Sequence, residues 1–151
     1  MKAVVQRVKK TTLSVDGELI SEIPFGLTVF LGVKKGDTEK EGAYIAKKIA
    51  GLRIFEDENG KTNLDLKSVN GSLLLVSQFT LYADCRKGNR PSFINAGAPN
   101  MANDLYEYII DLCKQEISVV EKGEFGADMK IHLLNDGPFT IIFDSDEMGI
   151  H

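Results

Sequence analysis

The fold is decided by residues 11–33, which read TTLSVDGELISEIPFGLTVFLGV. Asp16 and Gly17 supply the positive φ angles of a two-residue type I′ turn, so segments 11–15 and 18–23 are predicted to form a hairpin. After a break at 24–26, segment 27–33 is apolar on both faces, which is typical of a buried strand. This stretch therefore predicts an antiparallel or mixed sheet rather than repeated strand–helix–strand units.

Outside this stretch, strands again outnumber helices. A first helix is predicted after Asp37 or Thr38, either of which can cap it, and a second after Pro99 and Asn100. Further strands are predicted at 2–8, 53–56, 73–81, 130–134 and 139–143. This order predicts a single α+β domain over residues 1–151, with an antiparallel or mixed sheet curled into a β-barrel-like core and two main helices.

The composition excludes several classes of protein. Of the 151 residues, 43% are hydrophobic and 26% are charged, which excludes a disordered chain, a collagen and a coiled coil. No apolar run approaches the ~18 residues of a membrane helix, and the first residues lack the apolar segment of a signal peptide. We therefore expect a cytoplasmic protein with no membrane partner. The net charge of −4 disfavours electrostatic binding of nucleic acid over the whole surface of the molecule.

Neither a cofactor nor a metal is predicted. The chain has no glycine-rich phosphate loop and no Gly-x-Ser-x-Gly element. Its two cysteines, Cys85 and Cys113, are interpreted as free thiols, and its two histidines, His132 and His151, are too few for a zinc site. Because His132 lies in an apolar pattern, any catalysis is expected to work without an imidazole.

Polar residues interrupt the apolar segment 73–81 at Ser77, Gln78 and Thr80. In a strand, Ser77 and Phe79 share one face, and Gln78 and Thr80 share the other. One interpretation is a half-exposed strand with a polar outer face. The other is a strand end that opens onto a pocket, where a hydroxyl, an amide and backbone N–H groups converge on a carbonyl.

Two further segments leave alternatives open. Segment 135–140, NDGPFT, is either a plain hairpin turn or a Gly137–Pro138 element whose cis peptide would point two carbonyls the same way, towards an ammonium group. The cations Arg86, Lys87 and Arg90 form either a solvated loop or a phosphate contact.

Together these segments resemble the D-aminoacyl-tRNA deacylase family, of the D-Tyr-tRNA(Tyr) deacylase type. The matching stretches are SQFTL at 77–81, NDGPFT at 135–140, KGNRPSF at 87–93 and MKAVVQRV at 1–8. The resemblance runs from the first residue to about Asp144. Phe139 departs from the pattern, which has a smaller β-branched residue such as valine at that place.

The resemblance implies a homodimer with a β-barrel-like fold and an active site at the subunit interface. The implied substrate is the 3′ acceptor end of a tRNA that carries a D-amino acid by an ester bond, and the products are free D-amino acid and tRNA. Residues 77–80 are implied to be the catalytic residues that line the pocket. Gly137 and Pro138 are implied to form a cis peptide that enters the partner's site and rejects L-amino acids. Glycine mischarged on tRNA(Ala) is an implied second substrate, because glycine has no side chain to reject.

The chemistry leaves two catalytic routes open. Backbone N–H groups near Phe79 and Thr80 are suited to stabilise an oxyanion, at ~3 kcal/mol per donor. Either the ribose 2′-OH beside the ester assists the attack of water, so that DNA is not a partner, or the Thr80 hydroxyl is the nucleophile. Arg7 is interpreted as a buried cation that braces the Gly137–Pro138 carbonyls.

Four functions stay open at this point. The first is a D-aminoacyl-tRNA hydrolase, and the second is a tRNA- or nucleic-acid-binding module without catalysis. The third is a related enzyme that edits L-alanine with a trans Gly-Pro, and the fourth is a small esterase whose substrates lack the 2′-OH. Hydrolysis of D-Tyr-tRNA compared with L-Tyr-tRNA separates them.

Overall fold

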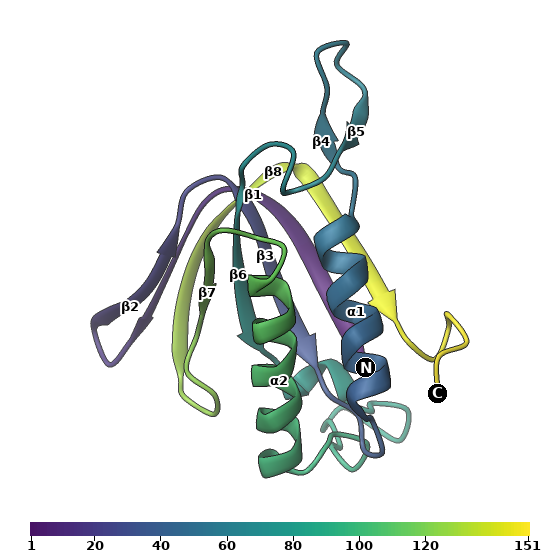
Figure 1. Ribbon diagram of the computed structural model, residues 1–151. Coiled ribbons are helices and arrows are strands. Elements are labelled where there is room, and N and C mark those ends of the chain that lie inside the picture. The colour runs from purple at the N-terminus through teal and green to yellow at the C-terminus, as the bar shows by residue number, and fades with distance from the viewer.

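A computed structural model describes residues 1–151, and its sheet is organised by the long first strand, β1 (Figure 1). The elements in chain order are β1 (Lys2–Val15), β2 (Glu18–Ile23), β3 (Gly26–Gly32), α1 (Glu39–Gly51), β4 (Phe55–Glu56), β5 (Thr62–Leu64), β6 (Ser72–Ser77), the 3-10 helix η1 (Phe79–Tyr82), α2 (Pro99–Lys114), β7 (Val120–Lys122) and β8 (Met129–Asp144). One edge of β1 pairs antiparallel with β8, and the other pairs antiparallel with β3 and then β2. Asp16 and Gly17 adopt positive φ angles of 50° and 80°, so the predicted hairpin is confirmed.

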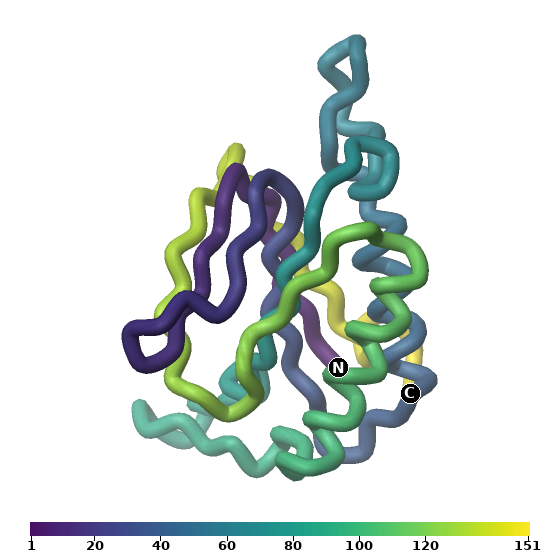
Figure 2. The backbone as a smooth tube through the Cα atoms, turned by 60° about the vertical axis from the view of Figure 1, so that its left-hand side comes forward, coloured from purple at the N-terminus to yellow at the C-terminus, as the bar shows by residue number.

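The sheet is mixed because β6 pairs in parallel with both β3 and β7. Strands β3 and β6 are buried along almost their whole length, as their unbroken apolar sequences predict. The strands curve round until the sheet is nearly closed, and α1 and α2 lie side by side on one face of it (Figures 1 and 2). The predicted α+β fold, with a curled mixed sheet and two main helices, is confirmed. A separate hairpin, β4–β5, projects from the body (Figure 1).

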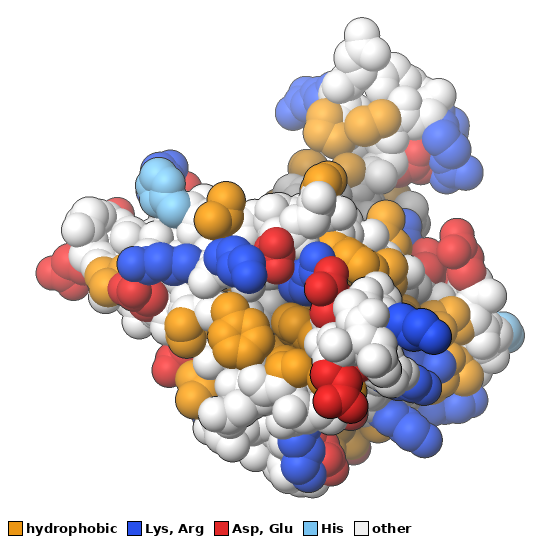
Figure 3. All heavy atoms as spheres, turned by 90° about the horizontal axis from the view of Figure 1, so that it is seen from above, with side chains coloured by type: hydrophobic (Ala, Val, Ile, Leu, Met, Phe, Trp, Pro, Cys, Tyr) orange, Lys and Arg blue, Asp and Glu red, His pale blue; other side chains and the backbone are white.

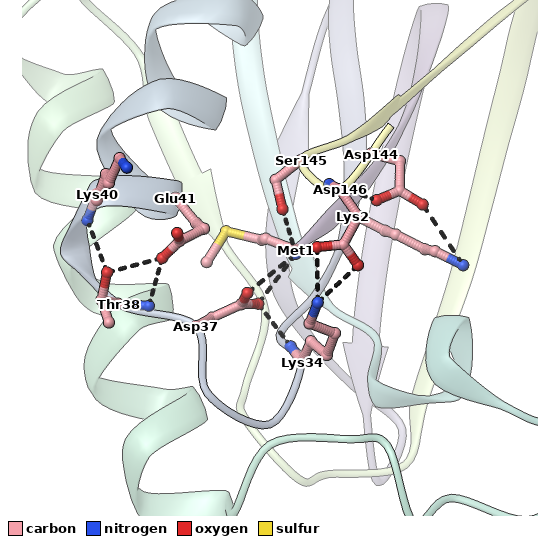
Figure 4. A network of polar contacts seen from close by, with 10 residues as sticks. All are labelled: Met1, Lys2, Lys34, Asp37, Thr38, Lys40, Glu41, Asp144, Ser145 and Asp146. Carbon is pink, nitrogen blue, oxygen red and sulfur yellow. Dashed lines mark hydrogen bonds and ion pairs between the residues drawn. The ribbon is translucent and has the colours of Figure 1, made fainter. Parts of the chain in front are cut away.

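Polar contacts around the first residue fasten three segments together (Figure 4). The Met1 α-ammonium donates hydrogen bonds to Asp37 Oδ1 at 3.1 Å and to Ser145 Oγ at 2.7 Å. Lys34 Nζ pairs with the Asp146 carboxylate at 2.6 Å. These contacts join the start of β1 to the loop before α1 and to the residues that follow β8.

Thr38 caps α1. Its hydroxyl accepts a backbone hydrogen bond from the first turn, and the Glu41 carboxylate accepts one from the Thr38 N–H at 2.7 Å. This reciprocal pair is a capping box, which satisfies N–H groups that have no partner inside the helix. Of the two predicted caps, Thr38 is therefore the correct one, and Asp37 instead binds Met1.

The prediction of one strand over 73–81 is wrong. Strand β6 ends at Ser77 and the chain turns into η1, so the predicted alternation of faces beyond Ser77 does not exist. The Gln78 N–H still donates to β3, but Leu81 folds back over that strand. Gly32 makes this close approach feasible, because a Cβ atom at Gly32 would lie 2.9 Å from the Leu81 Cβ.

The last two predicted strands, 130–134 and 139–143, are parts of one strand. Strand β8 runs through both and bulges away from β1 in between. The predicted turn is therefore a bulge, closed by a hydrogen bond of 2.9 Å from the Phe139 N–H to Asn135 Oδ1. Strand β7 was not predicted, because three residues are too few to show a period.

Candidate functional site

An apolar pocket of about 660 Å³ opens at the carboxyl ends of β3 and β6. Ser77, Gln78 and Phe79 line it, and most of its other walls are hydrophobic. These walls come from the first turns of α2 and from the loop that leads into β8. A mostly apolar hollow with a few polar groups at its edge is the usual form of a small-molecule site.

Thr80 lies beside the pocket but does not line it. Its side chain is exposed, and its hydroxyl accepts a hydrogen bond from Gln78 Nε2. Phe79 is 56% exposed and packs edge-to-face on Phe93, with the ring centroids 4.9 Å apart. Because η1 begins at Phe79, the N–H groups of Phe79 and Thr80 have no acceptor inside that helical turn. The Phe79 N–H belongs to a residue that lines the pocket, and the Thr80 N–H directly follows it.

Most residues that line the pocket are not among the predicted site residues, and Phe93, Asp128 and Tyr106 are three of them. Phe93 supplies the second ring at the rim, and Asp128 lies at the mouth, paired with Lys130 at 2.9 Å. Tyr106 of α2 donates its hydroxyl to a β6 carbonyl at 2.6 Å, and burial raises the pKa of Tyr106. Phe93 ends the KGNRPSF stretch of the family resemblance, but no motif marks Asp128 or Tyr106 in the sequence. The three residues come from distant segments that meet only in the folded chain.

The Gly137–Pro138 peptide bond is cis, and both residues are exposed on the bulge of β8. Asn135 and Thr140 close the bulge at its base. Asn135 Oδ1 accepts from the Phe139 N–H, and Asn135 Nδ2 donates to Thr140 Oγ1 at 3.2 Å. The first and last residues of the NDGPFT segment therefore hold its shape. Figure 3 views this end of the molecule, where hydrophobic side chains are interleaved with both basic and acidic ones.

Arg7 lies against this bulge. Its Nε donates to the Asp136 carbonyl at 3.0 Å, and its Nη1 donates to the Ile54 carbonyl at 2.7 Å. The guanidinium carbon lies 4.7 Å from the centroid of the Phe139 ring, and the side chain is only 13% exposed. Arg7 thus touches the carbonyl that precedes Gly137 and also ties the bulge to the base of the β4–β5 hairpin.

The two motifs are not brought together within one chain. Ser77 lies level with Ala3 of β1, whereas the bulge lies level with Arg7. Strands β1 and β3 stand between them in the sheet. Strand spacing and rise put the two motifs roughly 20 Å apart. No pocket residue comes from the bulge.

The predicted cations around residue 88 lie on an exposed loop closed by a pair of backbone hydrogen bonds between Asp84 and Ser92. Arg86 donates to both carboxylate oxygens of Asp84, at 2.9 and 2.6 Å, and these bonds lower the pKa of Asp84 to about 2. Lys87 and Arg90 form no ion pair. Two of the three cations are therefore free to contact an anion.

No cluster of His, Cys, Asp or Glu side chains has the arrangement of a metal site. Cys85 is exposed and Cys113 is buried, and both are free thiols. No helix of the protein is long and apolar enough to cross a membrane.

Comparisons with known proteins agree over almost the whole chain. Residues 4–144 match the family model for D-Tyr-tRNA(Tyr) deacylase. The D-aminoacyl-tRNA deacylase of Clostridium novyi is 57% identical over 145 residues, which cover 96% of this chain and 97% of the relative. The enzyme of the same name from Thermosipho africanus is 51% identical over 148 residues, which cover 98% of this chain and 99% of the relative.

Two solved structures have the same fold. The c-Myc DNA Unwinding Element Binding Protein superposes with a TM-score of 0.91 and 40% identity, over 96% of this chain and 99% of that one. A probable eukaryotic D-amino acid tRNA deacylase superposes with a TM-score of 0.83 over 95% of this chain and 98% of that one. At 17% identity, the second likeness concerns the fold alone.

Proposed function

This chain belongs to the D-Tyr-tRNA(Tyr) deacylase family, and from that premise we propose that it hydrolyses the ester bond of D-aminoacyl-tRNA, releasing the D-amino acid and a reusable tRNA. The observation that carries the proposal is the pocket at residues 77–79, which coincides with the SQFTL stretch of the family resemblance. We assign this activity to the cytoplasm, where aminoacyl-tRNA is used.

The polar edge of the pocket is suited to stabilise the tetrahedral intermediate. The ester carbonyl would lie at the N–H groups of Phe79 and Thr80, which have no acceptor in their own turn. Such fixed donors stabilise the developing oxyanion, and each is worth about 3 kcal/mol in the transition state. The apolar walls exclude bulk water and accept the body of the amino acid.

The ribose 2′-OH of the substrate is the group we assign to assist the attacking water. No histidine lines the pocket, and its one carboxylate, Asp128, is held by Lys130. The alternative nucleophile, the Thr80 hydroxyl, accepts a hydrogen bond from Gln78 and touches no base. A threonine nucleophile needs an adjacent base, and none contacts Thr80. Attack assisted by the substrate needs no base from the protein, so it fits the residues present better.

Chiral rejection is assigned to Gly137 and Pro138 of the partner subunit in a homodimer. The two motifs lie roughly 20 Å apart in one chain, by strand spacing and rise, so a site that contains both must draw them from two chains. Because a two-fold axis relates the subunits of a homodimer, each subunit would supply its Gly137–Pro138 element to the pocket of the other. An L side chain would meet the rigid backbone of this element, whereas a D side chain would point away. Glycine on tRNA(Ala) would be accepted for the same reason, because it carries no side chain.

The test is hydrolysis of D-Tyr-tRNA and of L-Tyr-tRNA by the purified protein without added metal. We expect rapid loss of the D ester and retention of the L ester. Gly-tRNA(Ala) in the same assay is expected to be hydrolysed. Equal loss of the D and L esters would refute the chiral element, and no loss of any ester would refute the hydrolase.

A second candidate, binding of nucleic acid without turnover, is favoured by one observation. The relative with 40% identity is named for binding a DNA unwinding element. The net charge of −4 argues against a broad duplex-binding surface on this chain. Competition by uncharged tRNA and by a DNA duplex of equal length distinguishes the two readings, because an enzyme of the acceptor end needs the ribose 2′-OH and a DNA-binding module does not.

A further inference from the structure

A hollow of about 440 Å³ is lined by the last turns of α1 and by the end of β8, and it shares no residue with the catalytic pocket. Its lining comprises Tyr44, Lys47, Lys48, Gly51, Leu52, Arg53 and Phe143. We call it the α1–β8 groove, and we propose that it binds the sugar–phosphate backbone of the tRNA substrate. The proposal rests on the proposed function and adds a second contact to it, outside the pocket that holds the aminoacyl group.

The charge of the α1–β8 groove is the first argument. Nine of the 18 Lys and Arg side chains pair with a carboxylate. Lys47, Lys48 and Arg53 form no such pair, and the groove contains no Asp or Glu. The acidic residue Asp65 lies within electrostatic range of Arg53, but it forms no ion pair with it. Three cations without an ion pair around one hollow, in a protein of net charge −4, form a local site for a polyanion.

The helix dipole accounts for only one of these cations. Lys48 lies in the last turn of α1, where a positive charge stabilises the helix end. Arg53 lies beyond the end of the helix, and Lys47 faces the hollow without a carboxylate partner. Helix stability therefore does not explain why the three charges meet.

The groove is also held in shape. Arg53 Nε donates to the Asn63 backbone carbonyl at 2.7 Å, and Arg53 Nη2 donates to the Asn63 side-chain oxygen. These bonds fix the guanidinium against β5 and leave Nη1 for a ligand. Tyr44 adds a ring, with Lys48 Nζ 5.5 Å from its centroid. Guanidinium groups, ammonium groups and aromatic rings are the side-chain groups that contact RNA phosphates, sugars and bases.

The position of the groove fits an RNA that continues past the active site. Phe143 of the groove and Gly137–Pro138 belong to the same strand, β8. Arg53 directly precedes Ile54, whose carbonyl holds Arg7 under the bulge. If the bulge of one subunit enters the partner's pocket, the groove of that same subunit lies near the tRNA whose aminoacyl end occupies the partner's pocket. The RNA backbone would then be contacted by one subunit while its aminoacyl end reacts in the other.

Charge reversal at the groove tests the proposal. The variant Lys47→Glu/Lys48→Glu is compared with wild type and with Lys35→Glu/Lys114→Glu, a control of equal charge change whose two exposed lysines line neither the groove nor the pocket. We expect the double variant to raise KM for D-Tyr-tRNA at least tenfold with little change in kcat. The slope of log(kcat/KM) against log[salt] should become shallower by about 1–2, because each lost phosphate contact removes ~0.7–0.9 from it.

Two further measurements separate this proposal from the proposed function. The first is hydrolysis of the D-tyrosyl ester of adenosine, which has no phosphodiester backbone. It should be equal in wild type and variant, and an equal loss on both substrates would overturn the groove as an RNA contact. The second is the Kd for uncharged tRNA by fluorescence anisotropy, which needs no turnover. If wild type hydrolyses neither ester, the proposed function fails while the Kd still decides the groove, and an unchanged Kd in the double variant overturns it.

Discussion

Phe139 is the residue at which this chain departs from the pattern of the family resemblance, and it lies against Arg7. The guanidinium carbon is 4.7 Å from its ring centroid, so an aromatic side chain here completes the set of contacts that hold Arg7. A cation–π contact of this kind is worth about 0.5–2 kcal/mol. Because Arg7 also binds the Asp136 carbonyl, the ring acts on Gly137 through Arg7.

We expect Phe139→Leu to weaken chiral rejection more than it weakens folding. The ratio of kcat/KM for D-Tyr-tRNA to that for L-Tyr-tRNA should fall about 2- to 30-fold, the range that 0.5–2 kcal/mol allows. Phe139→Tyr keeps the ring and should restore the ratio. An unchanged ratio in Phe139→Leu would show that the ring does not position the element.

Thr80 separates the two catalytic routes. We expect Thr80→Val to reduce kcat less than tenfold, because the donors assigned to the oxyanion are backbone groups. A substrate that ends in 2′-deoxyadenosine should lose about 100-fold or more, as removal of a catalytic acid–base group usually does. Both are measured by single-turnover hydrolysis of D-Tyr-tRNA. The reverse pattern would make Thr80 the nucleophile.

At the scale of residues, the sequence indicates which motifs are candidates for the site but not which residues they contact. Ser77 to Thr80 and Gly137–Pro138 are visible as polar interruptions and turn residues in apolar segments. The partners of Arg7 are not visible, because Ile54 and Asp136 are 47 and 129 positions away. Such contacts depend on strand register, and a register is set by the whole sheet.

Among the elements, helix α1 begins where the sequence predicts. The contribution of its N-cap, Thr38, to the free energy of unfolding can be measured. We expect Thr38→Ala to lower the free energy of unfolding by about 1 kcal/mol at pH 7, while Thr38→Ser stays near wild type. Urea denaturation followed by circular dichroism gives both values. A loss in Thr38→Ser equal to that in Thr38→Ala would mean that the hydroxyl is not the cap.

The same cap predicts a pH dependence. Burial by itself would raise the pKa of Glu41, but hydrogen bonds from the Thr38 hydroxyl and N–H outweigh it, so the pKa lies below its ordinary value. A lowered pKa in the folded state contributes stability above the unfolded pKa of about 4.3, and the contribution is lost as pH falls through the folded value. The stability difference between wild type and Glu41→Ala should therefore be larger at pH 7 than at pH 3. A constant difference across this range would contradict the assignment.

The thiol on α2 gives a second test of an element. Burial raises the pKa of Cys113 to about 12, so at pH 8 only ~10⁻⁴ of it is thiolate. Cys85 is exposed on a loop. Titration of the native protein with Ellman's reagent should show one fast thiol per chain, and a second only in denaturant. Cys85→Ser should abolish the fast phase, and two fast thiols in wild type would show that α2 does not pack as described.

Element boundaries were predicted best where the local signal is strong and poorly where a neighbour decides. The Asp16–Gly17 turn requires positive φ angles, and Asp-Gly is a residue pair that adopts them readily, so the turn can be predicted from these two residues alone. The end of β6 depends on Gly32 of β3, because the absence of a side chain at Gly32 allows Leu81 to fold back. The sequence around residue 77 therefore does not predict where β6 ends. Strand β8 passes through a glycine and a proline because its pairing with β1 resumes on the far side of the bulge.

At the scale of the whole molecule, the proposed contact between the pocket and the Gly137–Pro138 element joins two chains, so it cannot be seen in the sequence or in one chain. Two variants test it. Phe79→Pro is designed to disable the pocket, because proline at the first position of η1 removes one of the two backbone N–H groups assigned to the oxyanion. Gly137→Ala is designed to displace the chiral element, since a Cβ there would lie 2.9 Å from the Phe139 nitrogen at a φ of 145°. The pocket variant alone should hydrolyse little of either ester, whereas Gly137→Ala alone should hydrolyse L-Tyr-tRNA as well as the D ester.

A heterodimer of the two variants, purified through two different tags, then distinguishes the arrangements. Its one competent pocket belongs to the Gly137→Ala subunit, whose partner carries an intact Gly137–Pro138. If the element acts across the interface, that pocket is complete, so the heterodimer should hydrolyse D-Tyr-tRNA and again reject L-Tyr-tRNA. If the element acts within its own chain, the same pocket faces the displaced element, and L-Tyr-tRNA will be lost as fast as in the Gly137→Ala homodimer. Selectivity restored by a partner that cannot itself catalyse has no explanation in a one-chain site, because each chain alone holds the two motifs on opposite sides of β1 and β3.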